Sequence, residues 1–67
     1  MGVVDKGIIR ALSDGQQLNS RWIKNRLERE GIRVSTQYVR HRCEDMTSVG
    51  KLIKDDSGRL TEYRLVA

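Results

Sequence analysis

Residues 19–48 read NSRWIKNRLEREGIRVSTQYVRHRCEDMTS, and the caps and apolar spacing in this segment predict two consecutive helices. Asn19 and Ser20 are both favourable helix N-caps, and the segment behind them predicts a helix that runs to about Glu30. Gly31 is expected to end this helix, because glycine adopts the backbone conformation that closes many helices. The apolar residues that mark the helix are Trp22, Ile23 and Leu27.

A second helix follows after a short connection. Ser35 is its expected N-cap, and Val39, Cys43 and Met46 follow one another at i, i+4 and i+7, which places them on one helix face. The pattern predicts a helix over residues 35–48 that packs through these three side chains. Two short helices joined by a small turn, the second capped by Ser, form a helix-turn-helix pattern.

The sequence before this pair predicts one more helix. Val4, Ile8 and Leu12 recur at helical spacing and indicate a helix of roughly ten residues. Gly15 is a plausible end for the segment, since it accepts a left-handed conformation. Residues 16–18 are either a brief strand or a plain linker.

The sequence after Gly50 changes its apolar period. Leu52 and Ile53 form a short apolar run, residues 55–58 have turn chemistry, and residues 60–66 alternate. Two β-runs joined by a Gly-containing turn predict a hairpin. The expected fold class is therefore α+β, with three helices followed by a two-stranded β-hairpin, and residues 3–67 are expected to form a single domain.

The positive charge of the chain is concentrated in its middle. The 67 residues include 13 basic and 9 acidic side chains, for a formal net charge of +4. Between residues 20 and 42, seven basic residues accompany only two acidic ones, Glu28 and Glu30. A local positive surface attracts polyanions, of which nucleic acids and anionic membranes are the commonest. The basic residues of this stretch are Arg21, Lys24, Arg26, Arg29, Arg33, Arg40 and Arg42.

Several classes of function are disfavoured. His41 and Cys43 are two residues apart, so on a helix they point about 200° apart and cannot act together as base and nucleophile. They are also too few to ligate zinc, and we expect neither an enzyme, nor a metal site, nor a cofactor. No apolar run approaches the roughly 20 residues of a membrane span. The lone Cys43 is expected to be a small buried side chain in a reducing, cytoplasmic compartment.

The polar side of the 35–48 helix suits the reading of DNA. Arg pairs well with guanine, Gln with adenine, and Thr with a thymine methyl or a phosphate. Arg42 lies on a flank that is better placed for phosphate than for bases, and Glu44 is expected to pair with Arg40 at i, i+4. The residues that face outward near the helix start are Thr36, Gln37, Arg40 and His41.

From Val4 to Val66 the chain resembles an archaeal or bacterial winged helix-turn-helix regulator of the phage-repressor-like kind. The resemblance lies in GIIRALSDGQQLNSRWIKNRLEREG, IRVSTQYVRHRCEDM and SVGKLIKDDSGRLTEYRLV, and residues 35–50 are similar to a recognition helix. It implies sequence-specific binding of double-stranded DNA by a transcriptional regulator or repressor associated with the nucleoid. The resemblance implies that the residues on this helix that touch DNA are Thr36, Gln37, Arg40, His41 and Arg42, and we expect Ser35 at the helix start to join them.

Further contacts with DNA are expected outside this helix. Arg21 and Lys24 are candidate phosphate contacts on the preceding helix. Lys54 and Arg59 flank the hairpin turn, where they can reach adjacent backbone or the minor groove. The acids at 55 and 56 oppose deep insertion of this turn beside DNA.

Other readings stay open at this stage. A winged-helix domain can serve as a protein-interaction module, since fold alone does not settle function, and RNA binding is a weaker third option. Trp22 and Tyr38 could stack on single-stranded bases, although we expect them to pack at the edge of the small core. A homodimer on a palindromic site is plausible, because one copy of this size contacts few bases.

Overall fold

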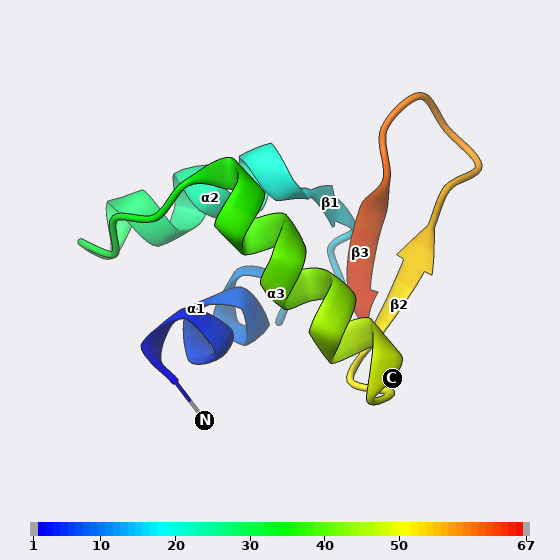
Figure 1. Cartoon of the computed structure of the whole chain (residues 1–67), viewed down its shortest axis with the longest axis horizontal. Coiled ribbons are helices and arrows are strands. Elements are labelled where there is room, and N and C mark those ends of the chain that lie inside the picture. The colour runs from blue at the N-terminus through cyan, green and yellow to red at the C-terminus, as the bar shows by residue number, and fades with distance from the viewer. Residues whose placement is uncertain (1, 67) are drawn as a thin grey trace.

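The computed structural model describes residues 2–66, so Ala67, at the end of the predicted domain range, lies outside the described residues. Three helices and three short strands form a compact α+β arrangement in which the helices pack beside an antiparallel sheet (Figure 1). The elements are α1 (Val3–Ala11), β1 (Leu18–Asn19), α2 (Ser20–Arg29), α3 (Thr36–Ser48), β2 (Leu52–Asp55) and β3 (Glu62–Leu65).

The helices α2 and α3 start at side-chain caps. The Asn19 side chain accepts a hydrogen bond from the backbone N–H of Trp22 at 2.9 Å, so Asn19 is the N-cap and Ser20 is the first helical residue. Ser35 accepts from the backbone N–H of Tyr38 at 3.0 Å, which confirms the predicted cap of α3. Both caps satisfy a backbone donor that the helix itself leaves unpaired.

The backbone conformation at the end of α2 directs the short connection toward α3. Gly31 has φ = 80°, a conformation that costs a side-chain-bearing residue energy and glycine very little. The backbone N–H of Ile32 donates to the carbonyl of Leu27 at 3.0 Å, and Gly31 N–H donates to the carbonyl of Glu28 at 3.0 Å. These two bonds close the helix in a Schellman motif and turn the chain toward α3.

The sheet has the order β1-β3-β2, so the last strand of the chain lies in its centre. Leu18 and Asn19 pair with Tyr63 and Glu62, and β2 pairs with β3 along its whole length. The prediction of a two-stranded hairpin was therefore incomplete, because the alternative of a brief strand before α2 is the correct one. The side-chain amide of Gln17 also donates to Asp55 at 3.0 Å and to Glu62 at 2.9 Å.

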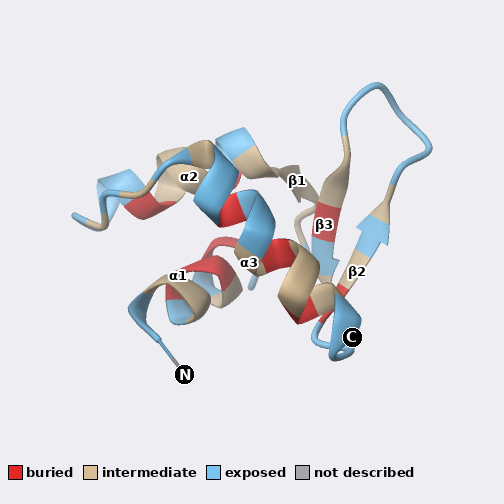
Figure 2. Cartoon of the chain, viewed as in Figure 1, coloured by how far each residue is buried: buried red, intermediate tan, exposed pale blue. Residues whose placement is uncertain are grey.

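The core lies between the three helices and the sheet (Figure 2). Val39, Cys43 and Met46 are buried on one face of α3, as their spacing predicts. Trp22 and Tyr38, by contrast, are 54% and 47% exposed, so neither belongs to the buried core, and their packing at its edge stays a prediction. The remaining buried residues of the core are Ile8, Ala11, Leu12, Ile23, Leu27, Leu52 and Tyr63.

Helices α1 and α2 approach closely at Gly7, which is buried in α1. A Cβ atom at this position would lie 2.2 Å from Leu27 Cδ2 and 3.2 Å from Ile32 Cδ1. Both distances are shorter than ordinary van der Waals contact. The absence of a side chain at Gly7 therefore lets Leu27 of α2 pack directly against the backbone of α1.

Candidate nucleic-acid interface

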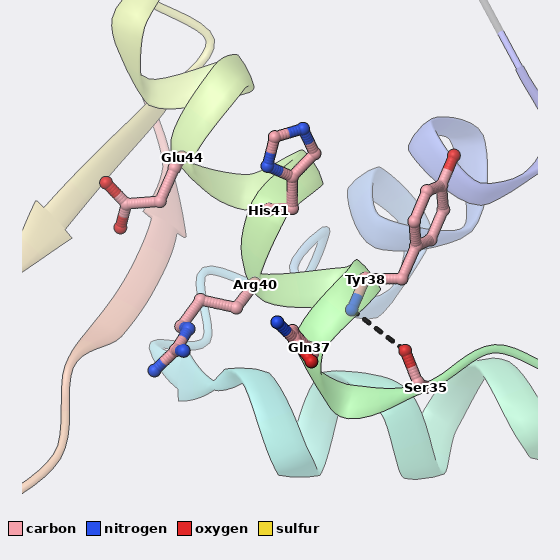
Figure 3. Close-up of a pocket in the computed structure, with 6 residues that line it drawn as sticks. All are labelled: Ser35, Gln37, Tyr38, Arg40, His41 and Glu44. Atoms are coloured by element: carbon pink, nitrogen blue, oxygen red, sulfur yellow. Dashed lines mark hydrogen bonds between the residues drawn. The ribbon is translucent and has the colours of Figure 1, made fainter.

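The outer face of α3 carries a shallow depression of about 450 Å³ (Figure 3). Gln37, Arg40 and His41 are exposed there, opposite the buried face of the helix. Figure 3 shows Arg40 extending from α3 over the start of α2, while Tyr38 points toward the side where α1 lies. The residues that line this depression are Ser35, Gln37, Tyr38, Arg40, His41 and Glu44.

Glu44 does not pair with Arg40, contrary to the sequence prediction. Its carboxylate accepts a hydrogen bond from the hydroxyl of Tyr63 and another from Lys54 Nζ at 3.1 Å. The bond from Tyr63 and the bond from Lys54 hold the pKa of the Glu44 carboxyl below its ordinary value. Glu44 thus links α3 to both strands of the hairpin and leaves Arg40 without a carboxylate partner among residues 2–66.

A second hollow, of about 430 Å³, lies where the start of α2, the start of α3 and the chain before β3 come together. Arg21, Arg40 and Arg59 line it, one from each of these three segments. Ser20 and Thr36 add two hydroxyl groups, and Leu60 adds an apolar side chain that is 61% exposed. No Asp or Glu of the described chain lines this hollow.

The three arginines of this hollow differ from the other predicted cationic contacts in their pairing. Within residues 2–66, none of the three forms an ion pair or a side-chain hydrogen bond. Lys24, in contrast, pairs with Glu28 at 3.3 Å, and Lys54 pairs with Glu44 at 3.1 Å. The first turns of α2 and α3 also hold no acidic residue, so the positive ends of both helix dipoles are not neutralised there.

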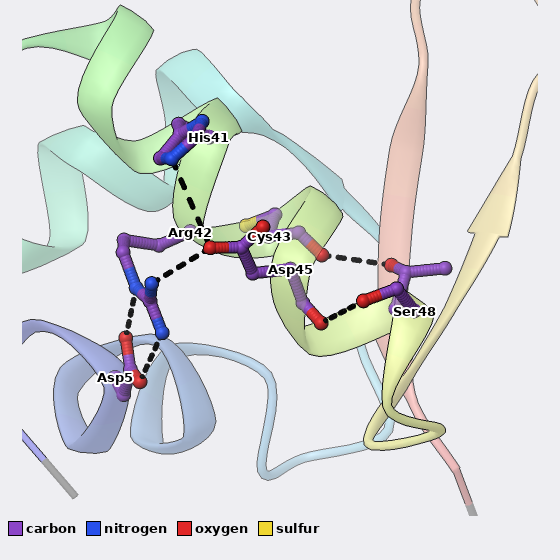
Figure 4. A network of polar contacts seen from close by, with 7 residues as sticks. Asp5, His41, Arg42, Cys43, Asp45 and Ser48 are labelled. Carbon is purple, nitrogen blue, oxygen red and sulfur yellow. Dashed lines mark hydrogen bonds and ion pairs between the residues drawn. The ribbon is translucent and has the colours of Figure 1, made fainter.

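Arg42 lies on the other side of α3 and is engaged within the fold (Figure 4). Its Nε and Nη2 donate to the two oxygens of Asp5 at 2.9 and 2.8 Å, and its Nη1 donates to Asp45 at 2.9 Å. His41 Nε2 lies 3.8 Å from the same Asp45 carboxylate. The structure therefore joins Arg42 to α1 and separates it from the other cationic residues predicted to contact DNA.

The loop between β2 and β3 is organised by its own acidic residues. Asp55 accepts hydrogen bonds from the backbone N–H and the hydroxyl of Ser57 at 2.8 and 2.6 Å. Asp56 accepts from the hydroxyl of Thr61 at 2.6 Å. These bonds to Ser57, followed by the bond from Gln17, hold the pKa of Asp55 below its ordinary value.

The structure thus brings together most of the candidate residues, but in two groups. Ser35, Gln37 and His41 lie on the outer face of α3, while Arg21, Thr36 and Arg59 lie around the hollow, and Arg40 borders both. Lys24 lies at a different surface hollow, which Ser35 also borders, beside Glu28 and Arg33. Sequence reasoning did not include Ser20 and Leu60, which line the hollow, among the candidate residues. The only signal for Ser20 was its position next to an N-cap, and the only signal for Leu60 was an apolar residue in a turn.

Comparisons of this chain with models of protein families, with curated protein sequences and with solved structures find no match. Among residues 2–66, no helix combines the length and the apolar character needed to cross a bilayer. In the same part of the chain, no three potential ligands among His, Cys, Asp and Glu gather closely enough to hold a metal ion.

Proposed function

We propose that this chain is a winged helix-turn-helix domain that binds double-stranded DNA sequence-specifically and acts as a transcriptional regulator or repressor. In this proposal the N-terminal half of α3 enters the major groove and the loop between β2 and β3 lies on adjacent backbone or minor groove. The order of three helices followed by a hairpin supports this assignment, as does the packing of α2 against α3.

The observation that carries the proposal is the open, acid-free start of α3. Gln37, Arg40 and His41 point outward there, and cations from two other elements flank them. A B-DNA major groove admits one α-helix, and base edges are read by side chains of this kind. Arg21 and Arg59 lie beside this helix face, where they would meet the phosphates at the groove edge.

The test is a binding titration on duplex DNA, single-stranded DNA and duplex RNA over a salt series, followed by selection from a random duplex pool. We expect preference for duplex DNA and a log–log salt slope of about −0.9 per phosphate contacted. We also expect one sequence to be enriched, and its length would tell whether one copy or a dimer binds. Absence of binding at low salt, or a slope near zero, would contradict the proposal.

A variant pair on α3 separates base reading from general attraction. Gln37→Ala should lower affinity for the selected site by about 1–3 kcal/mol and relax preference at one base pair. Ser48→Ala, an exposed change at the other end of the same helix, is the matched control and should leave the preference unchanged. Equal enrichment profiles for Gln37→Ala and the wild type would remove Gln37 from the interface.

The exposed aromatic residues favour a second candidate function, a protein-interaction module. Trp22 and Tyr38 are about half exposed, and aromatic side chains are enriched in protein interfaces. The salt series decides between the two functions, because a protein-interaction module would not bind duplex DNA with a steep salt slope. Trp22→Ala should leave DNA binding unchanged if DNA binding is the function.

A further inference from the structure

The hollow bordered by Arg21, Arg40 and Arg59 gathers three positive charges, and none of the three arginines forms an ion pair within residues 2–66. Three arginines, from α2, α3 and the loop before β3, line one hollow of about 430 Å³. Two carboxylates lie behind the lining residues: Glu44 accepts from the hydroxyl of Tyr63 and from Lys54, and Asp56 accepts from the hydroxyl of Thr61. Gathering like charges is unfavourable, and no Asp or Glu of the described chain lines the hollow itself, so the arrangement is stabilised when an anion enters.

The donors around the hollow match a phosphate group. The guanidinium group presents N–H donors in a planar fork that fits phosphate oxygens. The hydroxyls of Ser20 and Thr36 form no side-chain hydrogen bond within residues 2–66 and are able to donate as well. Leu60, exposed at the rim, offers an apolar surface that suits a sugar ring rather than a second charge.

We propose that this hollow binds one sugar–phosphate unit of a DNA strand, with its phosphodiester held jointly by Arg21, Arg40 and Arg59. The inference rests on the proposed function and deepens it, because it assigns Arg40 to the DNA backbone instead of to a guanine edge. Side chains from α2, α3 and the hairpin loop then converge on one phosphate. That single contact fixes the position of α3 in the groove relative to the hairpin, while Gln37 and His41 are left to face the bases.

The experiment uses duplexes of the selected site in which one phosphate at a time is replaced by a neutral methylphosphonate. Wild-type protein should lose affinity at several positions. At one of these positions, the same for all three variants, neutralising the phosphate should no longer weaken binding by Arg21→Ala, Arg40→Ala or Arg59→Ala protein. Each of these variants has already lost part of the group that recognises the charge of that phosphate. Each variant alone should bind the unmodified duplex about tenfold more weakly, with unchanged base preference and a shallower salt slope.

Arg29→Ala is the matched control, since Arg29 is an exposed cation at the far end of α2 and lines none of the hollows described. It should keep the wild-type response to the methylphosphonate at the shared position. The three hollow residues are exposed, so circular dichroism should show folded protein for every variant.

Three outcomes overturn the inference while leaving DNA binding intact. The three variants could respond to three different phosphates, or Arg40→Ala could change the preferred base pair, and either result would place Arg40 elsewhere. Displacement of the duplex by micromolar inorganic phosphate would identify the hollow as a site for free phosphate and also overturn it. Loss of all salt-dependent duplex binding by the wild type would instead remove the proposed function, and the inference with it.

Discussion

Arg42 of α3 and Asp5 of α1 form a bidentate ion pair, in which Arg42 Nε donates to Asp5 Oδ1 at 2.9 Å and Arg42 Nη2 donates to Asp5 Oδ2 at 2.8 Å. The Asp5 side chain is only 16% exposed, and that of Arg42 is 28% exposed. The pair therefore fastens the first helix to the third from a partly desolvated position. An arginine in such a pair is costly to withdraw toward DNA, because its departure leaves a carboxylate without its partner.

The first prediction concerns the pH dependence of stability. The Arg42 guanidinium lowers the pKa of Asp5 in the folded chain, so the pair stabilises the fold above the ordinary carboxyl pKa of about 4. This stability is lost as the pH falls through the lowered pKa of the folded state. Asp5→Asn should cost about 1 kcal/mol at pH 7 and much less at pH 2, measured by urea unfolding.

Glu28→Gln is the control for this measurement, since Glu28 is exposed and its pair with Lys24 should contribute little. A difference between Asp5→Asn and the wild type that stays constant from pH 7 to pH 2 would mean that the charge of Asp5 is not what matters. Arg42→Ala should also leave the salt slope of DNA binding unchanged, which separates its role from that of Arg40.

The second prediction concerns the bond between Tyr63 and Glu44. Tyr63 is fully buried, and its hydroxyl reaches the Glu44 carboxylate on α3. Tyr63→Phe keeps the ring but removes the donor, and should lower the free energy of unfolding by about 1 kcal/mol. For a domain of this size that loss corresponds to a fall in Tm of about 4–8 °C.

A double-mutant cycle with Glu44→Gln tests whether the effect belongs to this bond. We expect the two changes to be less than additive, since either one weakens the same interaction. Fully additive losses would show that the two residues act independently.

The third prediction is that Gly7→Ala destabilises the fold although it places a better helix former within α1. Helix propensity alone favours alanine by about 1 kcal/mol. The added Cβ, however, would lie 2.2 Å from Leu27 Cδ2, in the buried contact between α1 and α2. Overpacking of this kind typically costs about 1–3 kcal/mol, so we expect a net loss of about 1 kcal/mol in thermal or urea unfolding.

Adding Leu27→Val to Gly7→Ala should make the combined loss smaller than the sum of the two single losses, because the shorter side chain makes room for the new methyl group. Lys6→Ala, an exposed change at the neighbouring position, should stay within about 0.5 kcal/mol of the wild type. An increase in stability for Gly7→Ala would mean that α1 and α2 separate at little cost.

The fourth prediction concerns the reactivity of Cys43. The thiol is fully buried, and burial, with a smaller contribution from the neighbouring charge of Glu44, raises its pKa to about 12. At pH 8 a thiol reagent should therefore label the folded protein only as fast as the protein unfolds. Ser48→Cys in a Cys43→Ala background supplies an exposed thiol on the same helix and should be labelled at once; rapid labelling of Cys43 itself would contradict its burial.

The local features of this fold were predictable from sequence, and the distant pairings were not. Ser35 and Gly31 act on the backbone within a few residues, so their neighbours in sequence reveal what they do. The pair between Asp5 and Arg42 joins residues 37 positions apart, and the helical period, which places Arg42 on a flank of α3, does not reveal its partner on α1. The partners of Glu44 could not be predicted either, because they too are distant in sequence. The helical spacing suggests Arg40, whereas the actual donors, Lys54 and Tyr63, come from the sheet.

In the candidate site, too, the local features were predictable from sequence and the distant ones were not. The outward direction of Gln37 and His41 follows from the helical period once the apolar face of α3 is known. The meeting of Arg21, Arg40 and Arg59 around one hollow depends on how the sheet is placed against two helices. A two-residue strand such as β1 has too short a pattern to reveal that placement, because it is identified by its partner Tyr63 and not by its own alternation.

The central position of β3 has a consequence for how the chain folds. Neither β1 nor β2 has a partner until residues 62–65 are available, because both pair only with β3. Tyr63 also supplies the largest fully buried side chain, so the core remains incomplete until the same moment. During synthesis the helices would emerge first and remain loosely associated, and the sheet would assemble in one late step. We therefore expect a single cooperative transition, limited by a long-range strand pairing rather than by helix formation.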